Sequence, residues 1–181
     1  MSSEENLVRQ AIDGNQSAFT QLYDEHFDKV YRYIYFRVSN RDEAEDLTQE
    51  VFIKALRGIG SYKWRDVHFT SWLFRIAHNQ VIDYIRKQAK EKRATLDEAA
   101  TVVGDGDPVV MTEQKSEIEE LTKALKKLPA AQQEVISLRF IAGMPIAEVA
   151  KTLGKSEGTV KALQFNGTAS LRKYYSGAEN V

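Results

Sequence analysis

The sequence predicts an all-α protein with two small helical domains joined by a flexible linker, the C-terminal one a helix-turn-helix domain. Three observations favour this fold class. Apolar residues recur at three- and four-residue spacing along most of the chain, as on the buried face of a helix. Residues 94–113 replace this periodicity with acids and glycines, which is typical of a flexible linker. Two short amphipathic patterns then flank a glycine near the end. We predict domains at 1–93 and 116–176, with the linker at 94–115.

The composition indicates a soluble globular protein, since 43% of the 181 residues are hydrophobic and 28% are charged. No apolar run approaches the ~20 residues that cross a bilayer, and the polar start MSSEENLVRQ is unlike a signal peptide. Cysteine is absent, and His26, His68 and His78 have no metal-ligand spacing. We therefore expect a cytoplasmic protein without a metal or other cofactor. Because the net charge is −1, any nucleic-acid contact must come from local basic patches.

The first domain is predicted to open with a short helix from Glu4 to Ile12, ending at Gly14, and a long helix from Ser17 to Val38. Apolar residues recur at helical spacing along the long segment. Its later half is rich in aromatic residues, which we interpret as packing at the core and rim of a bundle: Tyr31, Tyr33, Tyr35 and Phe36.

The next helix is predicted from Arg41 to about Leu56, because Asn40 followed by Glu43 forms a capping-box pattern. Its buried stripe is expected to contain Ala44, Leu47, Val51, Ala55 and Leu56. The opposite face is acidic and polar, with Asp42, Glu45, Asp46, Gln49 and Glu50. Acids in the first turns are stabilised by the helix dipole, so a simply solvated face would explain them. The same acids could instead form a surface for a basic partner, and the pattern leaves both interpretations open.

Residues 58–68 are predicted to form a loop that interleaves aromatic and basic side chains, Tyr62, Lys63, Trp64 and Arg65. Such residues can stack on bases and pair with phosphates, or they can fold back on the core. A helix from Thr70 to Gln88 follows, with Trp72, Leu73, Ile76, Ala77, Val81 and Tyr84 on its apolar side. A second stripe contains Arg75, Asn79, Ile82, Arg86 and Lys90. It continues into a basic run from Arg86 to Arg93 that creates a local positive field.

The second domain is predicted to contain helices at Ser116 to Leu128 and Ala130 to Ala142, followed by a helix-turn-helix. Pro145 suits a helix start, and Gly154 tolerates the left-handed backbone that ends a helix. Ser156 is a suitable N-cap for the second helix, with Val160 and Leu163 facing inward and Lys161 and Gln164 outward. This second helix is a candidate for the DNA major groove, although an ordinary helical hairpin would show the same pattern.

Two pairs of windows resemble bacterial sigma factors. The segments DEAEDLTQEVFIKAL and FTSWLFRIAHNQVIDYIRK resemble sigma region two, and LKKLPAAQQEVISLRF with the helix-turn-helix resembles region four. With only a short linker between them, the chain is similar to the extracytoplasmic-function (ECF) group from about Asn15 to about Tyr174. The resemblance implies a non-enzymatic transcription initiation factor that binds core RNA polymerase, recognises the minus-ten and minus-thirty-five promoter elements and aids strand opening. It also implies an anti-sigma partner and no membrane insertion.

The resemblance assigns roles to three sets of residues. The polymerase clamp helices would be contacted by Asp42, Glu45, Asp46, Leu47, Gln49 and Glu50. The minus-ten strand would be held by Tyr62, Lys63, Trp64, Arg65, Arg75, Asn79, Arg86 and Lys87. The minus-thirty-five element would be read by Lys155, Ser156, Thr159, Lys161, Gln164 and Phe165. The acidic linker would run towards the RNA exit path.

The sequence departs from the sigma pattern late in the recognition helix. Asn166 stands where relatives often carry a basic residue, Gly167 follows it, and Ala162 offers only a methyl group. Because glycine costs roughly 1 kcal/mol inside a helix, we expect the end of this helix to fray or bend.

Two other classes of function remain open from the sequence. A stand-alone helix-turn-helix regulator would bind duplex operators without polymerase, as a symmetric dimer. A helical adaptor would use both halves for protein contacts alone. An enzyme is not indicated, because the chain has no glycine-rich phosphate loop and no set of nucleophile and base.

Overall fold

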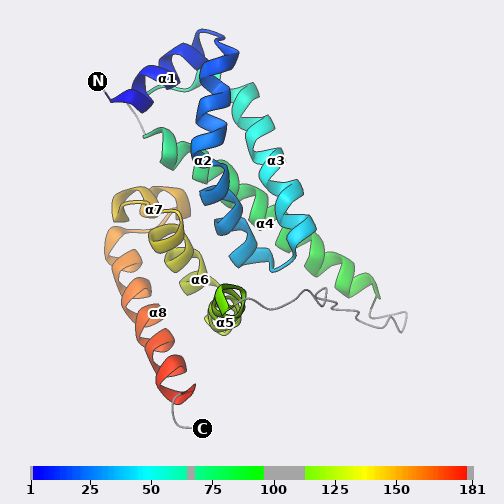
Figure 1. Ribbon diagram of the computed structural model, residues 1–181. Coiled ribbons are helices and arrows are strands. Elements are labelled where there is room, and N and C mark those ends of the chain that lie inside the picture. The colour runs from blue at the N-terminus through cyan, green and yellow to red at the C-terminus, as the bar shows by residue number, and fades with distance from the viewer. Residues whose placement is uncertain (1, 65–67, 96–112, 179–181) are drawn as a thin grey trace.

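The protein is helical in every regular element of the computed structural model, which describes residues 2–64, 68–95 and 113–178 (Figure 1). The first domain contains α1 (Ser3–Ile12), α2 (Gln16–Val38), α3 (Arg41–Gly58), the 3₁₀ turn η1 (Ile59–Ser61) and α4 (Phe69–Thr95). The second contains α5 (Glu113–Lys126), α6 (Ala130–Ile136), the π-helical turn η2 (Ser137–Ile141), α7 (Ile146–Leu153) and α8 (Glu157–Ala178). The predicted fold class is confirmed. Most of the predicted linker, residues 96–112, lies outside the described residues.

Side-chain caps define the helix starts of the first domain. Asn15 Oδ1 accepts a hydrogen bond from Ala18 N at 3.1 Å, and Asn40 Oδ1 accepts one from Glu43 N at 3.0 Å. Each bond satisfies a backbone N–H that has no partner within its helix. The predicted start of α3 at Asn40 is therefore confirmed.

The predicted buried stripe of α3 was wrong at its end. Leu56 is 53% exposed, while Phe52 is 4% exposed and packs in the core. Steps of four residues join the buried Val51, Ala55 and Ile59. Leu56 lies one residue, about 100° around the helix, beyond Ala55 and is therefore turned away from this line.

Helix α4 is longer than predicted, because it begins at Phe69 and continues to Thr95. The basic run from Arg86 to Arg93 is therefore helical, and its side chains extend from the C-terminal part of α4.

The helix-turn-helix has the local geometry that the sequence predicted. Gly154 ends α7 with φ 63° and ψ 36°, in the left-handed region. Ser156 Oγ accepts a hydrogen bond from Thr159 N at 3.1 Å and caps α8. Pro145 is the N-cap of α7, one position before the helix.

Helix α8 continues through Gly167 to Ala178, so the expectation that it would fray or bend near Gly167 was wrong. Gly167 is buried where α8 crosses α6. A Cβ atom at this position would lie 2.9 Å from Cγ1 of Ile136. The glycine therefore permits a close approach of two helices, and this packing outweighs its poor helix propensity.

The two domains pack against each other. Phe36 of α2 lies in one apolar cluster with Leu125, Leu128 and Ile136 of the second domain. The larger core cluster likewise contains buried residues of both domains, including Ile34 and Leu138. Figure 1 shows the second domain alongside α2. The sequence could not show whether the domains associate, and the structure shows them closed.

Candidate functional surfaces

The outer face of α3 carries the acidic set that the sequence singled out. Asp42, Asp46, Gln49 and Glu50 are exposed and Glu45 is half-buried. Leu47 instead packs into the core and is only 9% exposed. Its side chain is therefore not accessible to the partner that the sequence predicted it to contact. The remaining residues form a continuous negative surface along one side of the helix.

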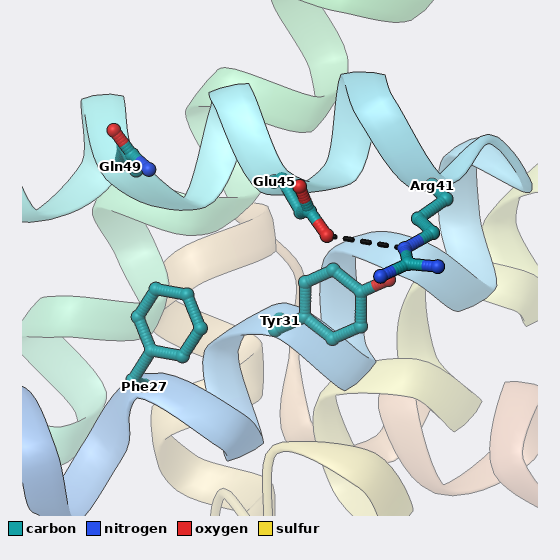
Figure 2. Close-up of a pocket in the computed structure, with 5 residues that line it drawn as sticks. All are labelled: Phe27, Tyr31, Arg41, Glu45 and Gln49. Atoms are coloured by element: carbon teal, nitrogen blue, oxygen red, sulfur yellow. Dashed lines mark hydrogen bonds and ion pairs between the residues drawn. The ribbon is translucent and has the colours of Figure 1, made fainter.

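A shallow hollow of about 450 Å³ lies beside this surface, between α2 and α3 (Figure 2). Phe27 and Tyr31 of α2 form its apolar floor, and their rings stack with centroids 6.5 Å apart. Arg41 Nε donates to Glu45 Oε1 at 3.2 Å along its rim, close to Gln49. The sequence identified the aromatic residues as packing residues but did not indicate that two of them line a hollow next to the acids.

The electrostatics of the hollow keep Tyr31 uncharged. Burial and the nearby Glu45 carboxylate raise the pKa of the Tyr31 phenol, and the Arg41 guanidinium only partly opposes them. A neutral phenol can both donate and accept hydrogen bonds. The hollow thus offers an aromatic floor and a negative rim, which suits a basic side chain with an apolar stem.

The loop before α4 divides its side chains between the core and solvent. Tyr62 is 7% exposed, and its ring centroid lies 5.0 Å from that of Trp72. Burial, together with the charges of Glu4 and Glu148, raises the pKa of Tyr62 to about 12. Trp64 is half-buried against Tyr62, and Lys63 is exposed. Of the two interpretations of this loop, packing holds for Tyr62. The predicted contact residue Arg65 lies outside the described residues.

Helix α4 presents the predicted polar stripe, but one member has a partner within the chain. Asn79, Arg86 and Lys87 are exposed. Arg75 Nε donates to Thr152 Oγ1 at 3.2 Å, and Arg75 Nη2 lies 3.6 Å from Glu148 Oε2. Thr152 and Glu148 both belong to α7 of the second domain. Arg75 is therefore engaged by the helix-turn-helix rather than open to solvent.

The outer face of α8 and the two residues before it carry most of the predicted DNA-reading residues. Lys155, Ser156, Thr159, Lys161 and Phe165 are exposed, and Phe165 is 73% exposed. An apolar ring this exposed on a helix is suited to contact with a base edge or a thymine methyl group.

Gln164 faces inward more than the sequence predicted. It is half-buried, and its Oε1 accepts a hydrogen bond from Arg139 Nε at 2.9 Å. Arg139 Nη1 also donates to the carbonyl oxygen of Met144 at 2.7 Å. Arg139 thereby joins the η2 turn, the residue before Pro145 and the recognition helix. Nothing in the sequence pattern indicated this role, because η2 departs from a regular helix at this point.

A buried polar cluster lies beneath the domain interface. Tyr33 Oη is 3.4 Å from His78 Nδ1. Burial and the charge of Arg37 lower the pKa of His78 to about 4, so this imidazole is neutral. Among the described residues, no group of acids and histidines could hold a metal ion, and no helix is long and apolar enough to cross a membrane.

Comparison with known families identifies both halves of the chain. The family described as Sigma-70 region 2 matches residues 22–91, and the family described as Sigma-70, region 4 matches residues 124–173. The first match covers α3 and most of α4, and the second covers the helix-turn-helix and most of α8.

Individual relatives span both regions. The ECF RNA polymerase sigma factor SigW of Bacillus subtilis is 34% identical over 180 residues, which cover 92% of this chain and 93% of SigW. The ECF RNA polymerase sigma factor BldN of Streptomyces coelicolor is 38% identical over 172 residues, and the aligned part is 92% of this chain but 64% of BldN.

Solved structures share the arrangement of both domains. CnrH, solved in complex with the cytosolic domain of CnrY, has a TM-score of 0.75 at 25% identity, covering 97% of this chain and 99% of CnrH. The sigma factor RpoE of Bartonella quintana, solved with the anti-sigma factor NepR, has a TM-score of 0.71 at 23% identity and shows the same fold, covering 87% of this chain and 96% of RpoE.

Proposed function

The chain belongs to the ECF RNA polymerase sigma factors, and we propose that it directs core RNA polymerase to promoters through separate protein-binding and DNA-binding surfaces. The observation that carries this division is the separation of charge in the first domain. The outer face of α3 is acidic, whereas the C-terminal half of α4 carries Arg86, Lys87, Lys90, Lys92 and Arg93. A chain with a net charge of −1 can in this way serve a basic protein partner and a polyanion at once.

The polymerase-binding surface consists of the exposed face of α3 and the adjoining hollow. Asp42, Asp46, Gln49 and Glu50 would pair with basic and polar residues of the polymerase clamp helices, with Glu45 at the rim. The floor of Phe27 and Tyr31 would accept the apolar stem of a lysine or arginine whose charge meets the rim. Acidic side chains on such a surface raise the rate of association more than the affinity. Because salt screens exposed charges, binding should weaken as the salt concentration rises.

The minus-ten surface consists of the exposed side of α4 and the loop before it. Asn79 can both donate and accept at a base edge, and Arg86 and Lys87 on the same rigid helix would hold phosphates. Unstacked bases of an opened strand can be captured one at a time at modest cost. Tyr62 is buried, so it would support the pocket from beneath rather than stack on a base.

The minus-thirty-five surface consists of the outer face of α8 and the two residues before it. Lys155, Ser156, Thr159, Lys161 and Phe165 would enter the major groove. Gln164 is half-buried against Arg139, so it would orient the helix more than read a base. We place the domains at 1–93 and 116–176, joined by the linker at 94–115, as the sequence predicts.

An anti-sigma factor is the regulatory partner we propose, because the sigma factor RpoE, which has the same fold, was solved in complex with the anti-sigma factor NepR. Since bacterial RNA polymerase acts in the cytoplasm, the protein would work there, and it would contribute no catalytic group of its own.

The test is titration of the purified full chain into labelled bacterial core RNA polymerase. Saturable binding that is lost with Asp46→Lys and kept with Asp24→Lys would support the proposal, since Asp24 is also an exposed acid of the first domain but belongs to α2 rather than to α3. Both variants change the net charge equally, so the difference isolates the α3 surface. No binding at micromolar concentrations, together with tight binding to duplex DNA alone, would instead indicate a stand-alone regulator.

A further inference from the structure

Glu148 of α7 lies against Arg75, which the sequence assigned to the minus-ten surface. Its Oε2 is 3.6 Å from Nη2 of Arg75. Its charge also contributes to the raised pKa of Tyr62, another residue of that predicted surface. The side chain of Glu148 is 12% exposed and that of Arg75 is 31% exposed. The contact is therefore partly shielded from water, and it joins the first domain to the helix-turn-helix.

Arg75 approaches α7 along one edge of its guanidinium. Nε donates to Thr152 Oγ1 at 3.2 Å while Nη2 faces the Glu148 carboxylate. Glu148 and Thr152 are four residues apart on α7, so one helix face presents both side chains to Arg75. Arg75 makes one hydrogen bond and one ionic contact there, and Glu148 Oε2 has no hydrogen-bond partner. A phosphate group can instead accept two N–H groups of an arginine at once.

We propose that Glu148 and Thr152 form an intramolecular latch that occupies Arg75 in place of the promoter strand, so that domain closure and minus-ten binding exclude each other. The proposal rests on the proposed function, since it requires that Arg75 meet DNA when the chain is open. The latch residues belong to the first helix of the helix-turn-helix. Opening of the two domains would therefore release Arg75 and the helix-turn-helix together.

A second feature of the closed structure favours opening. Arg37 is 8% exposed in α2, next to Phe36, which packs against the second domain. Its Nε and Nη1 atoms have no hydrogen-bond partner. Burying such donors is unfavourable, while the side chain of Arg37 also forms a hydrogen bond with Tyr33 of the same helix. A gain in exposure of Arg37 on domain separation would favour the open form. The closed state thus combines a favourable ionic contact at Arg75 with an unfavourable burial at Arg37, which keeps the balance between closed and open forms adjustable.

The closed arrangement is similar over nearly the whole chain to that of CnrH bound to the cytosolic domain of CnrY. If the free chain already adopts the closed conformation, a regulatory partner can bind that conformation directly. The partner would then increase the population of closed molecules and would not have to induce a new conformation.

The first experiment measures the closed population directly. The chain has no cysteine, so Asp13→Cys with Lys173→Cys gives two exposed labelling sites, one in each domain. Single-molecule energy transfer on the full chain should show a compact form in the parent. Glu148→Gln and, separately, Thr152→Val should raise the ratio of open to compact molecules about two- to fivefold, as for a partly exposed ion pair. Glu117→Gln, an exposed acid of α5, is the matched control and should leave the ratio unchanged.

The second experiment tests whether the released residue is Arg75. A fluorescent pool of random 20-nucleotide single strands is titrated with each variant at fixed salt. Glu148→Gln should bind the pool more tightly than Glu117→Gln does, and adding Arg75→Ala to Glu148→Gln should remove that gain. Circular dichroism melting of each variant confirms that the fold is intact, and Thr152→Val repeats the test without a change of charge.

Three results would decide against the latch. They are an unchanged compact population in both Glu148→Gln and Thr152→Val, an equal gain in Glu117→Gln, or a gain that persists without Arg75. Failure of the parent chain to bind core RNA polymerase would instead contradict the proposed function, and it can be seen separately because the energy-transfer experiment requires no polymerase.

Discussion

Substituting alanine for Gly167 tests how closely α8 must approach α6. The new Cβ would lie 2.9 Å from Ile136 Cγ1 and 3.1 Å from Ile136 Cδ1, well inside the separation of about 3.5–4.0 Å that carbon atoms prefer. Ile136 is 4% exposed and has little room to move. Overpacking of this kind costs about 1–3 kcal/mol, and alanine regains up to about 1 kcal/mol in helix propensity. We expect a net loss of about 1 kcal/mol.

A matched control lies in the same helix. A Cβ atom added at Gly177 would have no heavy atom within 4 Å, so Gly177→Ala tests helix propensity without overpacking. Thermal unfolding of the full chain should show Gly167→Ala melting about 2–4 °C lower than the parent, with Gly177→Ala at or above it. If Gly167→Ala is as stable as Gly177→Ala, the close approach does not restrict this position and the reasoning fails.

Coupling to Ile136 gives an independent check of the same contact. Ile136→Ala alone should cost about 2–5 kcal/mol, as a buried large-to-small change does. In the double variant the alanine at 167 should fill part of the space that Ile136 vacates, so the combined cost should be less than the sum of the separate costs. Purely additive losses would indicate that the two residues do not touch in solution.

Further expectations concern the surfaces and the domain interface. Asn79→Ala should relax base preference in minus-ten elements selected with the holoenzyme, and an unchanged preference would place the pocket elsewhere. Lys161→Ala should weaken minus-thirty-five binding but not core-polymerase binding, because the side chain is exposed on α8; equal losses would contradict the assignment. The pKa of His78 is lowered to about 4, so its stabilising contribution is complete above about pH 6.5 and is lost as the pH falls towards 4; His78→Gln should flatten that part of the stability profile.

Local chemistry allowed the start of α3 and the turn of the helix-turn-helix to be predicted. The Asn40 cap, the left-handed Gly154 and the Ser156 cap each depend on residues within a few positions along the chain. Two errors arose where packing between distant segments determines which residues are buried. Leu56 satisfied the apolar pattern of α3 but lies beyond its neighbours, and Gly167 looked like a weak point until α6 is placed against it. Periodicity describes one helix, whereas burial depends on what lies opposite.

The candidate site also depends on contacts between distant segments, which the sequence pattern of a single helix does not reveal. Residue type and helix face correctly indicated that Asn79 and Lys161 are exposed polar residues, because a regular helix presents them independently of any partner. The same reasoning placed Arg75 on the α4 stripe but could not show that Glu148, far along the chain in α7, lies 3.6 Å away. When only its own segment is considered, an exposed charged residue is predicted to bind an external ligand. Once the fold brings an internal acceptor to it, that ligand must compete with the chain, and the affinity of the surface becomes a property of the domain arrangement rather than of the residue.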